Sequence, residues 1–158
     1  MISIFFAALL GVQAAPVTPP EDPVDPYTQS NANAGATPFA GPGMLKAFHG
    51  KDGIARVVDG LVTRSMADPR ISDIFKGQDM VRLRRTLKEQ FCFILNGGCD
   101  YTGRDMKSSH KDLGIQTADF NALVENLQAA MRQEKVPFFA QNRLLAKLAP
   151  MKRDTVVR

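Results

Sequence analysis

Apolar residues recur at helical spacing in four separate stretches of this chain, and no stretch alternates in the manner of a strand. The first stretch covers residues 54–66 and ends at the Asp-Pro pair at 68–69, because the residue before a proline is pushed out of the α region. The second follows Asp79, which can cap a helix, and stops at the Asn-Gly-Gly sequence at 96–98. Both stretches predict amphipathic helices.

The other two stretches lie in the C-terminal third. Thr117 is expected to cap a helix that carries apolar residues over 120–131, and the Val-Pro pair at 136–137 is expected to open the last helix. Pro150 should bend that last helix near its end. With a short helical turn over 71–75, the pattern predicts an all-α domain whose four main helices form two crossing layers around one core.

The first 43 residues differ from the rest in composition. Residues 1–15 form a signal-like segment whose apolar run is too short to span a bilayer comfortably, and small residues allow cleavage after Ala14. No Lys or Arg precedes the run, so two interpretations stay open. The protein is exported to the periplasm or the exterior, or the segment stays uncleaved as a membrane anchor or has no function, which would leave a cytoplasmic protein.

Residues 16–43 are rich in proline and poor in apolar side chains, which predicts a disordered linker before a domain that covers residues 44–158. The first 43 residues contain no Lys or Arg, so the remainder has 20 basic against 13 acidic residues, or +7. Two interpretations stay open: an ordinary solvated basic surface, or one that attracts acidic partners or the carboxylates of a bound ligand. No long basic run with interleaved aromatic residues occurs, so nucleic-acid binding is not expected.

The segment 101–115 contains His110, one of only two histidines, in a stretch made flexible by glycine. Imidazole is the commonest protein ligand for metals and for haem iron. The other histidine, His49, is expected where a helix begins. Cys92 and Cys99 leave two alternatives open: they form a disulfide, as is usual in exported proteins, or Cys92 is a buried apolar residue and Cys99 a free thiol.

In their order and spacing, these segments resemble the group I truncated haemoglobins. The resemblance rests on Gly-Lys-Asp-Gly-Ile at 50–54, Ala-Asp-Pro-Arg-Ile at 67–71, Ile-Phe at 74–75, Gly-Gly at 97–98, and Tyr-x-Gly-Arg-x-Met-x-x-x-His-x-x-Leu-x-Ile at 101–115. It extends from about residue 44 to the C-terminus. It implies a two-over-two helical sandwich that encloses haem b, with His110 as the proximal iron ligand. We expect a monomer.

The resemblance also implies roles for individual residues. The positions that contact the cofactor are matched by Phe75, Leu83, Leu87, Phe91, Met106, His110 and Ile115. Without the resemblance, the apolar residues among them would be interpreted as ordinary core. Basic side chains that could pair with the haem propionates are Arg82, Arg84, Arg85, Arg104 and Lys107. No Cys-x-x-Cys-His sequence occurs, so covalent c-type attachment of the haem is not expected.

The ligand side of the haem departs from the family pattern. Many members carry a tyrosine late in the first long helix, where its hydroxyl donates a hydrogen bond to the ligand; an ungapped match places Val62 there. The expected distal pocket comprises Val62, Leu83, Thr86, Leu87 and Gln90. Only Thr86 and Gln90 can donate a hydrogen bond.

These features favour a globin that reversibly binds O2, CO or NO. The alternative is a haem enzyme with nitric oxide dioxygenase or peroxidase-like activity. Such an enzyme would need an external reductase, because the chain has no flavin or nicotinamide domain. A third alternative is a helical interaction module without haem.

Overall fold

The computed structural model describes residues 19–156, and within this range every regular element is a helix, which confirms the all-α prediction. The four long helices are α2 (Gly50–Ala67), α3 (Met80–Ile94), α5 (Thr117–Gln133) and α6 (Phe138–Leu148). The short α-helices are α1 (Gly43–Ala47), α4 (Met106–His110) and α7 (Lys152–Thr155). Three 3-10 turns complete the described range: η1 (Asn31–Ala34), η2 (Ser72–Phe75) and η3 (Ala149–Met151).

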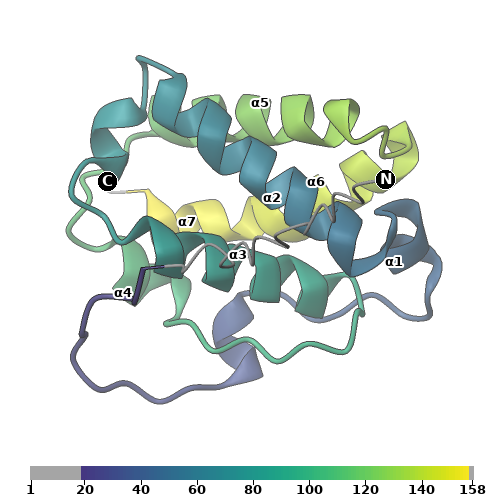
Figure 1. Cartoon of the computed structure of the whole chain (residues 1–158), viewed down its shortest axis with the longest axis horizontal. Coiled ribbons are helices and arrows are strands. Elements are labelled where there is room, and N and C mark those ends of the chain that lie inside the picture. The colour runs from purple at the N-terminus through teal and green to yellow at the C-terminus, as the bar shows by residue number, and fades with distance from the viewer. Residues whose placement is uncertain (1–18, 157–158) are drawn as a thin grey trace, which may run out of the picture.

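The long helices form two layers that cross each other (Figure 1). Helix α2 packs against both α5 and α3, and α5 also contacts α6. The short helix α4 packs against α7. This arrangement confirms the predicted two-layer sandwich. Among residues 19–156, no helix has both the length and the apolar character needed to cross a membrane.

The sequence signals place most helix ends correctly. Helix α2 ends at Ala67, and the carboxylate of Asp79 caps α3 by accepting a hydrogen bond from the backbone N–H of Arg82 at 2.9 Å. The predicted cap at Thr117 is wrong by one residue. Gln116 is the N-cap of α5, and its backbone N–H donates to the carboxylate of Asp119 at 2.8 Å.

At the position of the expected bend, Pro150, one 3-10 turn interrupts the α-helical hydrogen bonding, although the backbone stays in the right-handed helical region at Ala149, Met151 and Lys152. Helix α6 ends at Leu148, the 3-10 turn η3 contains Pro150, and α7 begins only afterwards. The missing N–H of proline removes a helical hydrogen bond, which explains why the helix breaks here. Helix α7, which follows this turn, contacts α4.

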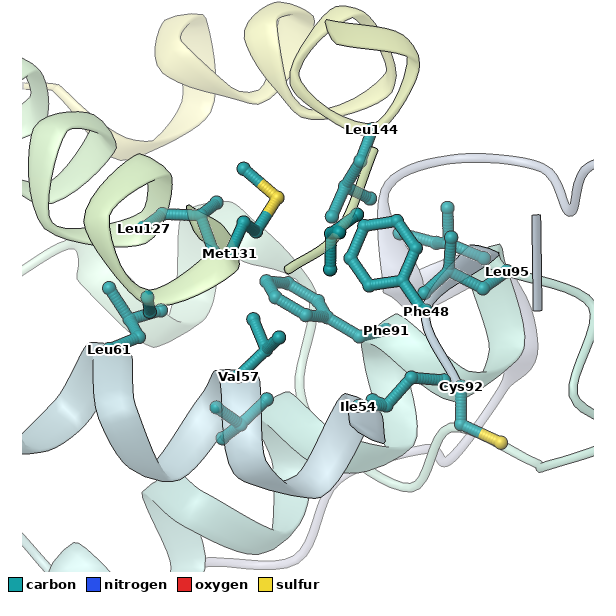
Figure 2. Packing of buried hydrophobic residues seen from close by; sticks show 14 of the residues in the cluster. Phe48, Ile54, Val57, Leu61, Phe91, Cys92, Leu95, Leu127, Met131 and Leu144 are labelled. Carbon is teal, nitrogen blue, oxygen red and sulfur yellow. The ribbon is translucent and has the colours of Figure 1, made fainter. Parts of the chain in front are cut away.

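The hydrophobic core draws on both layers. Phe48 at the end of α1, Phe91 of α3, Met131 of α5 and Leu144 of α6 are each at most 2 % exposed. Figure 2 shows these side chains converging with the apolar face of α2, which presents Ile54, Val57 and Leu61. Burial of this kind stabilises by about 1.5–3 kcal/mol for each large apolar side chain.

Residues 19–43 differ from the expected disordered linker, because they lie along the helical domain and contact it through many hydrogen bonds (Figure 1). We call them the N-terminal strap. Ala34 is fully buried, Phe39 is 9 % exposed, and the backbone N–H of Phe39 donates to the carbonyl of Ile94 at 2.8 Å. The low apolar content of this segment predicted disorder. The segment is ordered instead, because hydrogen bonds supply much of its contact with the helical domain. The signal-like segment 1–15 lies outside the described residues.

Cys92 and Cys99 form a disulfide, with their α-carbons 5.7 Å apart. The bond joins the last turn of α3 to the connection that leads to α4. A Cβ added at Gly97 would lie 2.6 Å from Sγ of Cys92, so the turn between the two cysteines requires glycine there. Of the two alternatives that the sequence leaves open, the structure therefore has the disulfide.

Reduction of this disulfide is expected to lower the free energy of unfolding by about 2 kcal/mol, the chain-entropy value for a loop this short. The measurement is urea unfolding followed by far-UV circular dichroism, with and without dithiothreitol. The control is the double variant Cys92→Ala, Cys99→Ser, on which dithiothreitol should have no effect. Equal stability of the native protein in both conditions would contradict the expectation.

Asp68, just after α2, is expected to make stability depend on pH. The Arg70 guanidinium and backbone N–H and the amide of Asn126 donate to its carboxylate and hold its pKa well below the usual range. The folded-state pKa is depressed, so this stabilisation is complete above the unfolded-state pKa of about 4 and is lost as the pH falls toward the folded-state pKa. Asp68→Asn should therefore lower the free energy of unfolding at pH 7, and the difference from the native protein should shrink as the pH falls. Thermal unfolding across this pH range tests it, with the exposed Asp112→Asn as control.

Candidate functional site

The short helix α4 holds the predicted ligand, His110, at its last position. Asp105 starts this helix. Its carboxylate accepts hydrogen bonds from the backbone N–H of Ser108 at 2.9 Å and from the Ser108 hydroxyl at 2.7 Å. These bonds lower the pKa of Asp105, so the cap is ionised at neutral pH. A helix of only one turn is unstable alone, and the cap and the contact with α7 hold it in place.

The imidazole of His110 is fixed by one hydrogen bond. Its Nδ1 lies 2.6 Å from the carbonyl oxygen of Met106, one turn earlier in α4. A carbonyl oxygen only accepts, so Nδ1 carries a proton, and in the neutral form of the ring Nε2 keeps its lone pair. This is the tautomer that a metal-ligating histidine uses, with a backbone carbonyl as the partner that orients the ring. The half-buried His110 therefore fits the role of a haem-iron ligand.

The apolar residues predicted to contact the haem or to line its distal side fall into three groups by their burial. Val62 of α2 and Phe91 of α3 are fully buried in the core. Leu83, Leu87 and Met106 are half-buried and pack against the edge of that core. The remaining two, Phe75 and Ile115, are half-buried outside the core cluster. Partly covered apolar side chains on α3 and α4 are the surfaces that a flat apolar cofactor would cover.

A direct contact joins α3 to α4 at this site. The amide nitrogen of Gln90 lies 3.5 Å from the sulfur of Met106 and donates to the carbonyl of Ala34 in the N-terminal strap at 2.9 Å. Gln90 is 5 % exposed, so the partners of this amide are groups of the protein rather than solvent. Its partners lie in the strap, in α4 and, through the sulfur of Met151 at 3.8 Å, in η3.

The hydroxyl of Thr86 also already has hydrogen-bond acceptors within the protein. It lies 3.0 Å from the carbonyl of Arg82 and 3.3 Å from that of Leu83, which is the usual back-bonding of a helical threonine. The two distal residues able to donate are therefore both bonded to backbone carbonyls. The other distal positions, Val62, Leu83 and Leu87, have no donor.

Four of the five candidate propionate partners already contact other groups of the protein. Arg84 pairs with Asp59 at 2.9 Å, and Arg104 donates to the Asp25 carbonyl at 2.9 Å. Arg82 and Arg85 both contact the carboxylate of Glu21. Lys107 is exposed on α4. Sequence reasoning missed Glu21 because it lies in the predicted linker. The available signal was that this segment contains acidic residues but no basic residue.

His49 lies where α2 begins, as predicted, and away from α4. It is the N-cap of α2, with φ 58°, and its Nδ1 lies 3.2 Å from the carboxylate of Glu134 at the end of α5. Arg56 donates to the same carboxylate. These contacts give His49 a structural role at the junction of α2 and α5, and they leave His110 as the histidine available for a cofactor.

Comparison with known proteins agrees with the geometry. The family model described as "Bacterial-like globin" matches residues 44–156. The group 1 truncated hemoglobin GlbN of Mycolicibacterium paratuberculosis is 31 % identical over 102 residues, which cover 65 % of this chain and 75 % of that protein. That of Nostoc commune is 34 % identical over 82 residues, which cover 52 % and 70 %.

Solved structures show the same fold. The truncated hemoglobin of Tetrahymena pyriformis in its Fe(III) form superposes with a TM-score of 0.69 at 23 % identity, covering 73 % of this chain and 98 % of that one. The 2/2 hemoglobin of Synechococcus sp. PCC 7002, in the cyanomet state with covalently attached heme, gives a TM-score of 0.67 at 21 % identity, with the same coverage.

Proposed function

The chain belongs to the bacterial-like globin family and, within it, to the group 1 truncated hemoglobins, and from this we propose that it binds haem b through His110 and carries a small diatomic ligand on the opposite face. Family membership supports haem-based ligand binding in general. The identity of the axial ligand, the type of haem and the choice among O2, CO and NO are specific to this proposal.

One observation carries the proposal: the hydrogen bond from His110 Nδ1 to the Met106 carbonyl. It fixes both the tautomer and the orientation of the ring, as an imidazole ligand requires. Haem, once bound, supplies an iron centre able to take a diatomic gas. The residues Leu83, Leu87, Phe91 and Met106 would exclude water from the two porphyrin faces, and the half-buried Phe75 and Ile115 would cover its edges.

The apolar distal side supports a specific ligand preference. Val62 provides no donor, and the hydroxyl of Thr86 and the amide of Gln90 are bonded to backbone carbonyls. Oxygen bound to haem is more polar than carbon monoxide and gains more from a hydrogen-bond donor in a dry pocket. We therefore propose a globin that holds oxygen weakly, favours carbon monoxide relative to oxygen, and oxidises readily.

We further propose that the protein acts outside the cytoplasm. The signal-like segment 1–15 and the Cys92–Cys99 disulfide both support an oxidising compartment. We also propose that the exported globin acts as a monomer and that an external donor reduces its haem.

Titration of the haem-free protein with haemin tests the proposed function. A one-to-one end point with a sharp Soret band, a pyridine haemochrome spectrum of the b type, and a carbon monoxide complex after reduction are expected. Absence of a saturable Soret change in folded protein would reject haem binding and leave the helical interaction module as the interpretation.

A further inference from the structure

The N-terminal strap touches both of the helical regions between which the proposed haem would lie. On α3 it contacts Arg82, Arg85 and Gln90. On the connection that leads into α4 it contacts Thr102 and the residues beside it. The strap therefore joins the helix that carries the distal leucines to the segment that carries His110, as its course past α3 and α4 in Figure 1 shows.

The first strap contact is an ion pair built around Glu21. One carboxylate oxygen of Glu21 lies 2.9 Å from a terminal nitrogen of Arg85 and 3.5 Å from one of Arg82. The pair is partly shielded, because the side chains of Glu21 and Arg82 are 25 % and 22 % exposed. Hydrogen bonding from Arg85 lowers the pKa of Glu21, so the group is a carboxylate at neutral pH. Two guanidinium groups thus share one carboxylate.

The second contact fixes the strap to the connection before α4. The hydroxyl of Tyr27 donates to the carbonyl of Thr102 at 2.7 Å, and the guanidinium of Arg104 lies 5.1 Å above the Tyr27 ring. The amide oxygen of Asn31 accepts from the backbone N–H of Tyr101 at 2.7 Å. Burial raises the pKa of Tyr101 to about 12, so its phenol stays neutral and donates to the Arg104 carbonyl at 2.9 Å.

Arg85 links the two contacts. Its guanidinium bonds to Glu21 on one side and to Glu89 and the hydroxyl of Thr102 on the other. Glu89 in turn accepts from the hydroxyl of Thr102 at 2.7 Å. A change in the partner of Arg85 would therefore alter the hydrogen bonds of Thr102, in the segment that leads to His110.

We propose that the N-terminal strap is a latch over the haem site and that the Glu21 carboxylate occupies, at Arg82 and Arg85, the place that a carboxylate of the incoming haem takes. This inference rests on the proposed function. A haem propionate and a glutamate side chain present the same carboxylate to a guanidinium pair. Only one of them can be bound there, so release of Glu21 and capture of haem are coupled.

The coupling has a definite kinetic signature. Weakening the Glu21 contact should speed haem uptake, because the competitor is easier to displace, and should leave haem loss unchanged, because the bound state no longer contains that contact. A strap that merely holds haem in place would behave differently: weakening it would speed haem loss.

The test measures dicyanohaemin uptake by the haem-free protein in stopped flow, and haem loss to an excess of apomyoglobin. Glu21→Gln is expected to take up haem about tenfold faster than the native protein, with loss unchanged within twofold. Asp25→Asn is the matched control. It makes the same charge change in the same strap, yet Asp25 contacts Arg104 through its backbone carbonyl, so uptake should stay at the native rate.

A second arm varies the haem instead of the protein. The dimethyl ester of haemin has no free carboxylates, so its uptake should differ little between Glu21→Gln and the native protein. Equal acceleration with haemin and with its ester would overturn the proposed competition, as would an unchanged rate with haemin or faster haem loss in Glu21→Gln. Glu21→Asp keeps the charge on a shorter side chain, so its rate of haem uptake should lie between those of the native protein and Glu21→Gln. It replaces Glu21→Gln in the test if that variant does not fold.

Tyrosine fluorescence of the haem-free protein reports on the latch without any haem. The chain has two tyrosines, Tyr27 and Tyr101, and no tryptophan, and both tyrosines lie where the strap meets the α4 connection. Glu21→Gln should raise acrylamide quenching toward that of the unfolded chain, whereas Asp25→Asn should not. Failure of haem to bind any of these proteins would reject the proposed function; binding at equal rates would reject only the latch.

Discussion

Replacement of His110 by glycine is expected to abolish tight haem binding while leaving the fold in place. His110 occupies the last position of the one-turn helix α4, and its Nε2 is the group proposed to hold the iron. Changes to groups that merely orient a metal ligand cost about 10- to 100-fold in affinity, so loss of the ligand itself should cost at least about 100-fold. Titration with haemin, followed at the Soret band, gives this ratio directly.

The same substitution should also remove the stabilisation that haem confers. At a free haem concentration about 1,000 times the dissociation constant, this linkage contributes about 4 kcal/mol, which thermal unfolding with and without haemin detects. His49→Gly is the matched control, because it removes the other histidine, and the spectrum should stay native. Added imidazole should restore a native-like spectrum to His110→Gly. An unaltered five-coordinate ferrous spectrum in His110→Gly would show that another residue holds the iron.

Introduction of a hydroxyl at position 62 is expected to slow oxygen dissociation about tenfold. That factor corresponds to about 1.4 kcal/mol, within the range of a single hydrogen bond. Val62 is 1 % exposed and belongs to the apolar core cluster, so a tyrosine there would bring a donor to a pocket whose other donors, Thr86 and Gln90, are bonded to backbone carbonyls. The measurement is the oxygen dissociation rate of the ferrous protein after rapid mixing with carbon monoxide.

Val62→Phe is the control for Val62→Tyr, because it adds the same ring without the hydroxyl. Both variants overpack a buried position, which typically costs about 1–3 kcal/mol of stability. Only their difference in oxygen dissociation therefore reports on the hydrogen bond. If neither folds, the pair Leu87→Gln and Leu87→Met makes the same comparison from α3. Slow dissociation from the native protein, equal in Val62→Phe and Val62→Tyr, would mean that a donor such as Thr86 already reaches the ligand.

The periodicity of apolar residues predicted the four long helices and most of their ends, because each end carries a local signal. Pro69 ends α2, and Asp79 caps α3. The cap of α5 was missed because Thr117 is the commoner N-cap type, whereas Gln116 is held there by its bond to Asp119. Helix α4 is too short to show periodicity at all, since five residues make little more than one turn.

The candidate site was predictable where it depends on residue type and spacing, and unpredictable where it depends on distant contacts. His110 stands out as one of two histidines, whereas Val62 was assigned to the distal side through the resemblance to the truncated haemoglobins. The bonds of Gln90 to Ala34 and of Arg85 to Glu21 join residues 56 and 64 positions apart, and no local pattern indicates such pairs. The strap was therefore mistaken for a linker, although Tyr27 and Phe39 are aromatic residues that a linker does not need.

The buried residues of the strap determine where a shortened version of this protein can safely begin. The family match starts at residue 44, and a truncation there would remove both Ala34 and Phe39. The amide of Gln90, 5 % exposed, would lose its acceptor, and the carbonyl of Ile94 would lose the N–H of Phe39. Buried polar groups left without partners cost about 1–3 kcal/mol each. The folding unit is thus longer than the family boundary, and a recombinant form for structural or spectroscopic work should keep the strap residues that contact the domain, of which Glu21 is one.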